Sequence, residues 1–218
     1  MALARETVIA TALDLLDQAG LDNLTMRRLA DALQVKAASL YWHFANKQAL
    51  MDAMADALMA QVAQAAPSTG HASEDPLTAV AAVAHEIRGA LLARKDGARV
   101  YAGTYVVTEN VMRVAEAMIG PLRQAGASTR LACWSSFALL DYVLGFVMEE
   151  QGSPSINPKE SALTEQRVAF AALAAPSYPH VAAAMDDVFH LDFDARFTTG
   201  LDLFIAGLRV KLEKTSVV

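Results

Sequence analysis

Apolar residues recur three or four positions apart along most of the chain, which is the spacing of one face of an α-helix. Val8, Ala12 and Leu15 show this spacing over residues 5–19, and Gly20 follows at the position of a C-terminal helix cap. The sequence shows no pair of strand-like segments and no internal repeat. The pattern therefore predicts an all-α fold.

Two short helices and a longer one are expected after the first helix. Thr25 resembles an N-cap for a helix over residues 26–33, and the turn QVK separates that helix from another over residues 37–44. Asn46 then resembles the cap of a longer helix over residues 47–64.

The stretch APSTGHASEDP, residues 66–76, interrupts the helical pattern with Pro, Gly, Ser and acidic residues. It predicts a linker after a small helical domain at residues 1–47 and a connecting helix at 48–65. A larger helical domain is then expected at residues 77–218. Its helical patterns cover residues 77–94, 97–105, 108–124, 128–150, 163–174, 179–190 and 194–213.

Composition supports a folded helical protein. Hydrophobic residues make up 54% of the 218 residues, against 11 Gly and 7 Pro, which favours helices around a sizeable core. The apolar runs near residues 80 and 140 are too short or too interrupted by charge to span a bilayer, and the N-terminus lacks a signal-peptide pattern. Cys133 is the one cysteine, and no Cys/His cluster has metal-ligand spacing. We expect a cytoplasmic protein with no membrane segment, disulfide, metal or cofactor.

The formal net charge of −6 does not favour a nucleic-acid partner, because phosphates require local positive charge. The charge is unevenly distributed, however. Lysines and arginines balance the acidic residues over residues 1–50, so the whole negative excess lies beyond that segment. What decides DNA binding is whether the positive groups share a face.

The second and third helices match the spacing of a helix-turn-helix, in which the later helix enters the major groove of DNA. If Leu40 and Phe44 point into a small core, steps of about 100° per residue place Ala38, Tyr41 and Trp42 outward. Ser39 and His43 then lie on the flanks of this outward face. Outward aromatics could contact sugars, phosphates and thymine methyl groups.

The outward aromatics have an alternative position, packed against the first helix or the connecting helix as aromatics usually are in cores. Arg27 and Lys47 favour DNA instead, because each lies near a helix N-terminus, where free N–H groups and the helix dipole suit phosphates. Either charge alone would be an ordinary solvated side chain. Combined with the helix-turn-helix spacing, the two charges predict DNA binding.

The string LTMRRLADALQVKAASLYWHFANKQALMDAM resembles the DNA-binding domain of the TetR family of transcriptional regulators. The shared signature is an LT-x-R-x-LA-x-x-L-x-V run, followed by an LYWH run and a capped helix that contains a lysine. This resemblance implies DNA contacts at Thr25, Met26, Arg27, Ala37, Ala38, Ser39, Tyr41, Trp42, His43 and Lys47. Ala37 and Ala38 stand where tetracycline repressors carry a polar base-reading residue and a proline, so the operator sequence of those repressors is not carried over.

The segments ALLARKDGARVYAGTY and LGFVMEEQ resemble the ligand-binding domain of the tetracycline repressors of this family. Tyr101 stands where those proteins have a histidine that binds drug-chelated magnesium, and Tyr105 stands at an arginine of their switching turn. Thr104 and an acidic group at Glu149 remain, but loss of the imidazole removes the metal's direct protein ligand. Magnesium-tetracycline is therefore not expected to be the effector.

Family position and helix face together select a set of candidate ligand-binding residues. They are His85, Ile87, Tyr101, Thr104, Tyr105, Met112, Phe137, Tyr142 and Glu149. Tyr101 and Tyr105 are four positions apart, and each hydroxyl needs a partner if it is buried. The apolar members could equally be core residues. As a set, they predict a site between helices for an apolar, partly aromatic small molecule.

Small residues in the last two long helices indicate close helix approach. Gly145, Gly200 and Gly207 lie there among bulky apolar residues. The resemblance implies a four-helix interface between two subunits, and packing within one subunit is the alternative. A two-fold dimer can read a palindrome, whereas one recognition helix reads too few base pairs, so a homodimer is expected.

These features predict a homodimeric, ligand-responsive repressor that binds a palindromic operator in double-stranded DNA and is released by a small effector. Two other classes remain open. An enzyme could use His85, Asp141, Glu149 and Glu150, although no nucleophile elbow, phosphate loop or metal cluster accompanies them. A DNA-binding protein without an effector is the other class, but it would not need the large apolar C-terminal domain.

Overall fold

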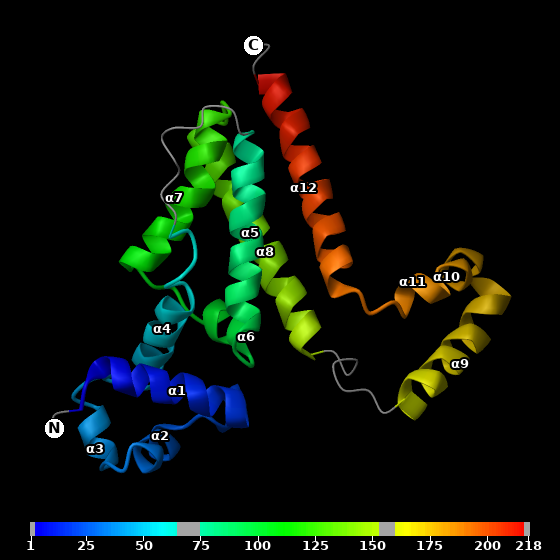
Figure 1. Ribbon diagram of the computed structural model, residues 1–218. Coiled ribbons are helices and arrows are strands. Elements are labelled where there is room, and N and C mark those ends of the chain that lie inside the picture. The colour runs from blue at the N-terminus through cyan, green and yellow to red at the C-terminus, as the bar shows by residue number, and fades with distance from the viewer. Residues whose placement is uncertain (1–2, 65–74, 153–159, 216–218) are drawn as a thin grey trace.

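The computed structural model describes residues 3–64, 75–152 and 160–215, and within these ranges it contains helices and no strand. Figure 1 shows an N-terminal unit of helices α1 to α4 beneath a taller C-terminal unit, from which helices α9 to α11 project to one side. The expected all-α fold is confirmed. Residues 65–74, which include most of the expected linker, and residues 153–159 lie outside the described residues.

The N-terminal unit follows the predicted caps closely. Its elements are α1 (Arg5–Ala19), a 3-10 turn η1 (Leu21–Asn23), α2 (Met26–Ala32), α3 (Ala37–Leu40) and α4 (Lys47–Leu58). Gly20, with φ of 76°, ends α1 by donating its N–H to the carbonyl of Leu16. The side chain of Thr25 caps α2, and that of Asn46 caps α4.

The helix α4 is shorter than expected, since it ends at Leu58 instead of residue 64. Arg113 supplies the physical reason. Its guanidinium donates to the carbonyls of Met59, Ala60 and Val62 at 2.9 to 3.2 Å. These carbonyls would otherwise accept hydrogen bonds from a continuing helix. A side chain that lies 51 residues or more further along the chain therefore fixes the end of α4.

Five helices build the C-terminal unit: α5 (Pro76–Leu92), α6 (Gly97–Ala102), α7 (Glu109–Gln124), α8 (Thr129–Gly152) and α12 (Phe193–Thr215). The helix α5 packs against α7, α8 and α12. Fully buried Ile87, Leu91, Leu139 and Phe197 belong to their common core. The helix α6 is three residues shorter than expected, because the chain turns at Gly103.

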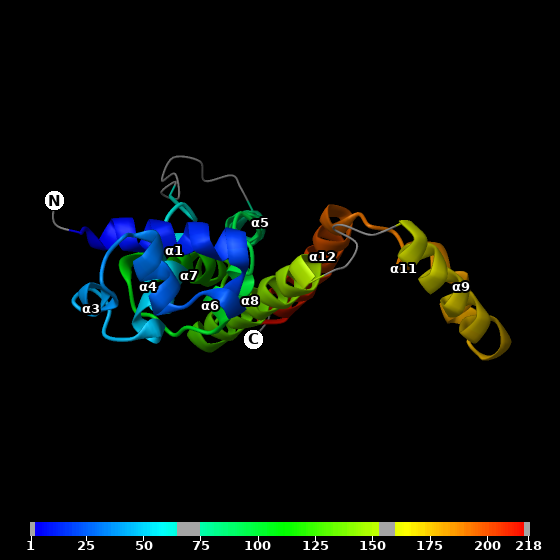
Figure 2. The ribbon, with the colours of Figure 1, turned by 90° about the horizontal axis from the view of Figure 1, so that it is seen from below.

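An arm is formed by α9 (Glu160–Ser177), α10 (Pro179–Ala183) and α11 (Met185–Val188). The single helix expected over residues 179–190 is wrong, since the chain breaks at Ala184 into two short helices. The arm helices pack mainly on one another, and Figure 2 shows the arm extending well beyond α8 and α12. Several of its apolar side chains are exposed: Val168, Leu173, Tyr178, Val181 and Val188.

The contact between α8 and α12 explains why a glycine is needed at position 200, one of the three glycines expected to allow close helix approach. A Cβ atom added to Gly200 would lie 2.8 Å from Cζ of Tyr142, whose hydroxyl donates to the carbonyl of Phe197 at 2.8 Å. Gly200 therefore permits close packing within one subunit, which was the alternative to a dimer contact. Added Cβ atoms at Gly145 and Gly207 would meet open space.

Contrary to the expectation for the apolar run near residue 140, α8 is by length and composition alone long and apolar enough to cross a membrane, and it is the one such helix within the described part of the chain. Core helices of folded proteins pass the same criterion. Here, Leu139, Val143 and Val147 of α8 are fully buried inside the protein.

Candidate nucleic-acid interface and ligand cavity

The helix-turn-helix is held on the first helix by its inward residues. Leu40 and Phe44 are buried, as the sequence predicts. The Arg5 guanidinium lies 4.3 Å from the centre of the Phe44 ring and donates to the carbonyl of His43 at 2.9 Å. At the turn, Gln34 adopts a positive φ of 56°. The segment after α3 is thus fixed in position by α1.

The outward side chains of this segment are free of the protein core. Trp42 is 90% exposed and Tyr41 is 53% exposed, so the alternative in which they pack against neighbouring helices is wrong. Ala38 is also exposed, and Ser39 and His43 are half-buried on the flanks. Exposure of the apolar indole ring to water is unfavourable in free energy. The exposed Trp42 therefore makes this surface a candidate binding face.

Basic side chains accompany the aromatics. Arg27, Arg28, Lys36 and Lys47 are exposed, and none forms an ion pair with another described residue. Thr25 is exposed too, while Met26 and Ala37 are half-buried against the core. The structure thus brings the expected DNA-contacting residues into one region around α2, α3 and the start of α4, and their contact with DNA stays a prediction.

A set of acidic and basic side chains connects the N-terminal unit to the start of α6, and we call it the α6 clasp: Asp14, Asp17, Asp22, Arg94, Asp96 and Arg99. Arg94 bonds to Asp17 at 2.6 Å and to Asp14 at 3.2 Å, and the Lys95 N–H donates to Asp17 at 2.9 Å.

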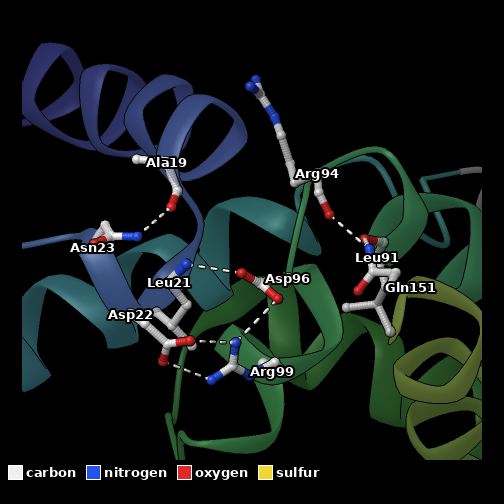
Figure 3. A network of polar contacts seen from close by, with 9 residues as sticks. All are labelled: Ala19, Leu21, Asp22, Asn23, Leu91, Arg94, Asp96, Arg99 and Gln151. Carbon is white, nitrogen blue, oxygen red and sulfur yellow. Dashed lines mark hydrogen bonds and ion pairs between the residues drawn. The ribbon is translucent and has the colours of Figure 1, made fainter. Parts of the chain in front are cut away.

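Around Asp96 the clasp continues to η1 (Figure 3). The Asp96 carboxylate accepts from the N–H of Leu21 at 2.8 Å, and Arg99 joins Asp96 to Asp22. The hydrogen bond from Arg99, followed by its charge, lowers the pKa of Asp22 below its usual value. On the other side, Gln151 of α8 donates to the carbonyls of Leu91 and Arg94. The loop before α6 is therefore held from two directions.

Sequence reasoning missed the α6 clasp. Asp14, Asp17 and Asp22 lie in one segment, and Asp96 lies with the two arginines in residues 94–99. Opposite charges in two segments were the one available signal. That signal does not say which charges meet, since the partners are separated by 77 to 80 residues.

A cavity of about 650 Å³ lies between the segment after α6, α7 and α8. Five of the expected ligand-binding residues line it: Tyr101, Thr104, Tyr105, Met112 and Phe137. Further lining comes from residues that were not expected, chiefly Val and Met side chains of α7 and the α8 residues Cys133, Ser136, Leu140, Asp141, Leu144 and Met148. Period-3.6 spacing on α8 could have indicated them, once Phe137 was placed in the cavity.

Four expected lining residues lie outside this cavity, which corrects the predicted set. Ile87 is fully buried in the core between α5 and its neighbours. His85 packs edge-on against Phe197, with ring centres 5.1 Å apart. Tyr142 is occupied by its bond to Phe197, and Glu149 pairs with Arg196 at 3.2 Å. His85, Tyr142 and Glu149 each contact a residue of α12, because α5 and α8 each have one side toward α12.

Polar groups in the cavity are few. Thr104 and Ser136 donate their hydroxyls to backbone carbonyls of Tyr101 and Ala132. Burial raises the pKa of the Tyr101 phenol, and the Asp56 carboxylate raises it further, so this hydroxyl is neutral at physiological pH. Within the described ranges, no group of three or more His, Cys, Asp or Glu side chains is placed to hold a metal ion.

The N-terminal unit has a helix-turn-helix with exposed aromatic and basic side chains, and α6 joins it to a helical unit with an apolar cavity. These two features together define a DNA-binding transcriptional regulator with a sensor domain. Residues 8–54 match the family of bacterial regulatory proteins, tetR family, and residues 66–212 match the tetracyclin repressor-like C-terminal domain. The chain belongs to the TetR family of ligand-responsive transcriptional repressors. Members of this family are DNA-binding regulators and not enzymes, which excludes the enzyme class considered above.

Individual relatives extend over nearly the whole chain. The tetracycline repressor protein class A from transposon 1721 of Escherichia coli is 37% identical over 206 residues, covering 94% of this chain and 90% of that protein. A possible TetR family transcriptional regulator from Streptomyces coelicolor A3(2) is 41% identical, with a TM-score of 0.83 over 95% of this chain and 99% of that one. The Streptomyces coelicolor TetR family protein ActR in complex with actinorhodin is 30% identical, with a TM-score of 0.84 over 97% and 99% of the two chains.

Proposed function

We propose that the protein is a cytoplasmic homodimeric repressor that binds a palindromic operator and is released when a small, largely apolar effector enters the cavity. The observation that carries this proposal is the position of α6. Its N-terminal end belongs to the α6 clasp on the N-terminal unit, while Tyr101 and Ala102 at its C-terminal end line the cavity. One helix of six residues thus connects the cavity to the N-terminal unit that carries the helix-turn-helix.

Operator contact is assigned to the exposed face of the helix-turn-helix. Trp42 and Tyr41 would bury apolar area against the sugar and base edges, while Arg27 and Lys47 would neutralise phosphates. Support comes from their exposure and from the lack of ion pairs at the basic residues among those described. Because α3 has four residues, one copy reads few base pairs, and two copies are needed for a specific site.

A second copy of the chain would cover the outer faces of α8 and α12. Trp134 of α8 is 66% exposed and Leu203 of α12 is 72% exposed, and Gly207 leaves room for close approach. Burying such residues against a two-fold copy removes apolar area from water on both subunits. The names of the relatives above, which include a repressor and a complex of ActR with actinorhodin, support a repressor that binds a further molecule.

Coupling would pass from the cavity to the DNA through α6. An effector that contacts Tyr101 and Thr104 changes the position of the last turn of α6, and the α6 clasp passes the change to α1 and η1. Release follows only if the effector binds the DNA-incompetent state more tightly than the DNA-competent one. Magnesium-tetracycline is not expected in this role, since Tyr101 offers a neutral phenol in place of an imidazole ligand.

The proposal is tested by selecting bound sequences from random double-stranded DNA and then measuring affinity by fluorescence anisotropy at fixed salt. The expected result is a two-fold symmetric site whose affinity falls when a cavity ligand is added. If a saturating ligand leaves the DNA affinity unchanged, the protein binds DNA without an effector and the proposal is wrong. Salt-dependent binding without sequence preference would contradict the operator.

A further inference from the structure

The charge of the cavity wall is unusually one-sided. Among the described side chains that line it, Asp141 is the one charged group, and none of these described side chains is a lysine, arginine or histidine. Asp141 forms no ion pair or hydrogen bond with another described residue. A carboxylate without a basic partner therefore stands at the edge of an otherwise uncharged cavity.

Three arginines of α7, α8 and α12 have partners away from Asp141. Arg113 of α7 donates to backbone carbonyls at the end of α4. Arg130 of α8 lies 5.4 Å from the centre of the Trp134 ring, and Arg196 pairs with Glu149. None of these arginines lines the cavity, so an anionic ligand would find no counterion in its wall.

The rest of the wall suits an apolar cation. Tyr101, Tyr105 and Phe137 offer aromatic rings that attract positive charge, and Met112 and Met148 offer polarizable sulfur. The hydroxyl of Tyr101 makes no hydrogen bond within the described part of the chain, so it is available as acceptor or donor to a ligand. Asp141 is exposed to solvent at the edge of the cavity, and an anion beside it would face its repulsion.

We infer that the effector of this protein is an apolar organic molecule with a single positive charge, of the arylalkylamine type, whose ammonium group pairs with Asp141, and that carboxylates of the same shape are rejected. This inference rests on the proposed function for its regulatory meaning, but binding itself can be tested without DNA.

The test uses three fluorescent probes with one four-ring skeleton: 1-pyrenemethylamine, 1-pyrenemethanol and 1-pyrenecarboxylic acid. They are titrated into the full-length protein at pH 7. We expect the amine to bind at least about tenfold more tightly than the acid, with the alcohol between them, because opposite and like charges at one site differ by this factor or more. Equal or tighter binding of the acid, or no saturable binding of the amine, overturns the inference.

Two variants assign the preference to one carboxylate. Asp141→Asn is expected to bring the amine-to-acid affinity ratio close to one while binding of the alcohol is retained, which also reports that the cavity is intact. Glu116→Gln, at an exposed position of α7 outside the cavity, makes the same charge change and should leave the ratio unaltered. An unchanged ratio in Asp141→Asn contradicts the inference.

The same probes separate this inference from the proposed function. If the amine binds as expected but leaves the DNA affinity unchanged, the inference of a cationic ligand is supported and the proposed release from DNA by an effector is contradicted. If the acid both binds more tightly and releases the DNA, the proposed function stands and the cationic class fails.

Discussion

At the scale of single residues, Trp42 and Phe44 are two positions apart and have opposite tasks. Trp42 is 90% exposed and Phe44 is 1% exposed. The Phe44 ring fills the space between α1 and the end of α3 beneath Arg5. One aromatic therefore belongs to folding and the other is available to a partner.

Trp42→Ala is expected to leave the free energy of unfolding within about 0.5 kcal/mol of the parent, since an exposed side chain contributes little to the core. Its DNA affinity should fall by about tenfold or more, because the indole area that covers sugar and base is lost. Chemical denaturation and anisotropy measure the two effects. Phe44→Ala is the matched comparison and should lower stability by about 3 to 5 kcal/mol. Unchanged DNA affinity in Trp42→Ala would remove this residue from the interface.

Gly200 is a second residue whose role is local. Gly200→Ala places a methyl group against the Tyr142 ring, which is held by its bond to Phe197. We expect a loss of about 1 to 3 kcal/mol in unfolding free energy. Gly89→Ala is the control, because its Cβ meets open space on α5, and it should be neutral or stabilising by up to about 1 kcal/mol. Thermal and denaturant unfolding compare the two, and equal effects would contradict the close contact.

At the scale of elements, α6 and its clasp matter more for coupling than for stability. The Arg94 pairs are partly exposed, and exposed ion pairs each contribute at most about 1 kcal/mol. Their geometry nevertheless ties the loop before α6 to α1. The free energy of these ion pairs is small enough for ligand binding to overcome it. This suits a connection whose geometry has to change when the effector binds.

Arg94→Gln is therefore expected to alter stability by less than about 1 kcal/mol while reducing, several-fold, the factor by which an effector weakens DNA binding. The factor is obtained from anisotropy titrations with and without effector. Lys95→Gln removes the same charge one residue later, where no ion pair of the described residues involves the side chain, and should leave the factor unchanged. Identical factors in Arg94→Gln and the parent would show that coupling takes another route.

At the scale of the whole molecule, exposed apolar surface gathers on α8, α12 and the arm. The arm has few contacts with the rest of the chain, and the exposed residues of α12 include Leu203 and Val210. Large exposed apolar surfaces mark interaction sites in soluble proteins, and a second copy of the chain is the partner proposed for α8 and α12.

Leu203→Lys is expected to convert the dimer into a monomer, because each subunit would then place a charge in an apolar interface. Sedimentation velocity measures the assembly, and affinity for a palindromic site should fall to that for a half-site. Ala82→Lys adds the same charge at an exposed position of α5 and should remain dimeric. A dimeric Leu203→Lys variant would exclude the proposed interface.

The sequence by itself determined the all-α fold, the starts of α2 and α4 and the helix-turn-helix. These features depend on residues within a few positions of one another. They are the helix caps at Thr25 and Asn46, the burial of Leu40 and Phe44, and the exposure of Trp42. Periodicity and capping report such local relations directly.

The tertiary structure decided what lies between distant segments. The guanidinium of Arg113 fixes the end of α4. Arg94 and Arg99 pair with acidic residues of α1 and η1. His85 and Tyr142 contact α12 and do not line the cavity, whereas Tyr101 and Asp141 line it. Each case depends on which faces of two helices meet. Helical spacing shows that a helix has an apolar face, but the neighbour that covers this face is chosen by the packing of the whole core.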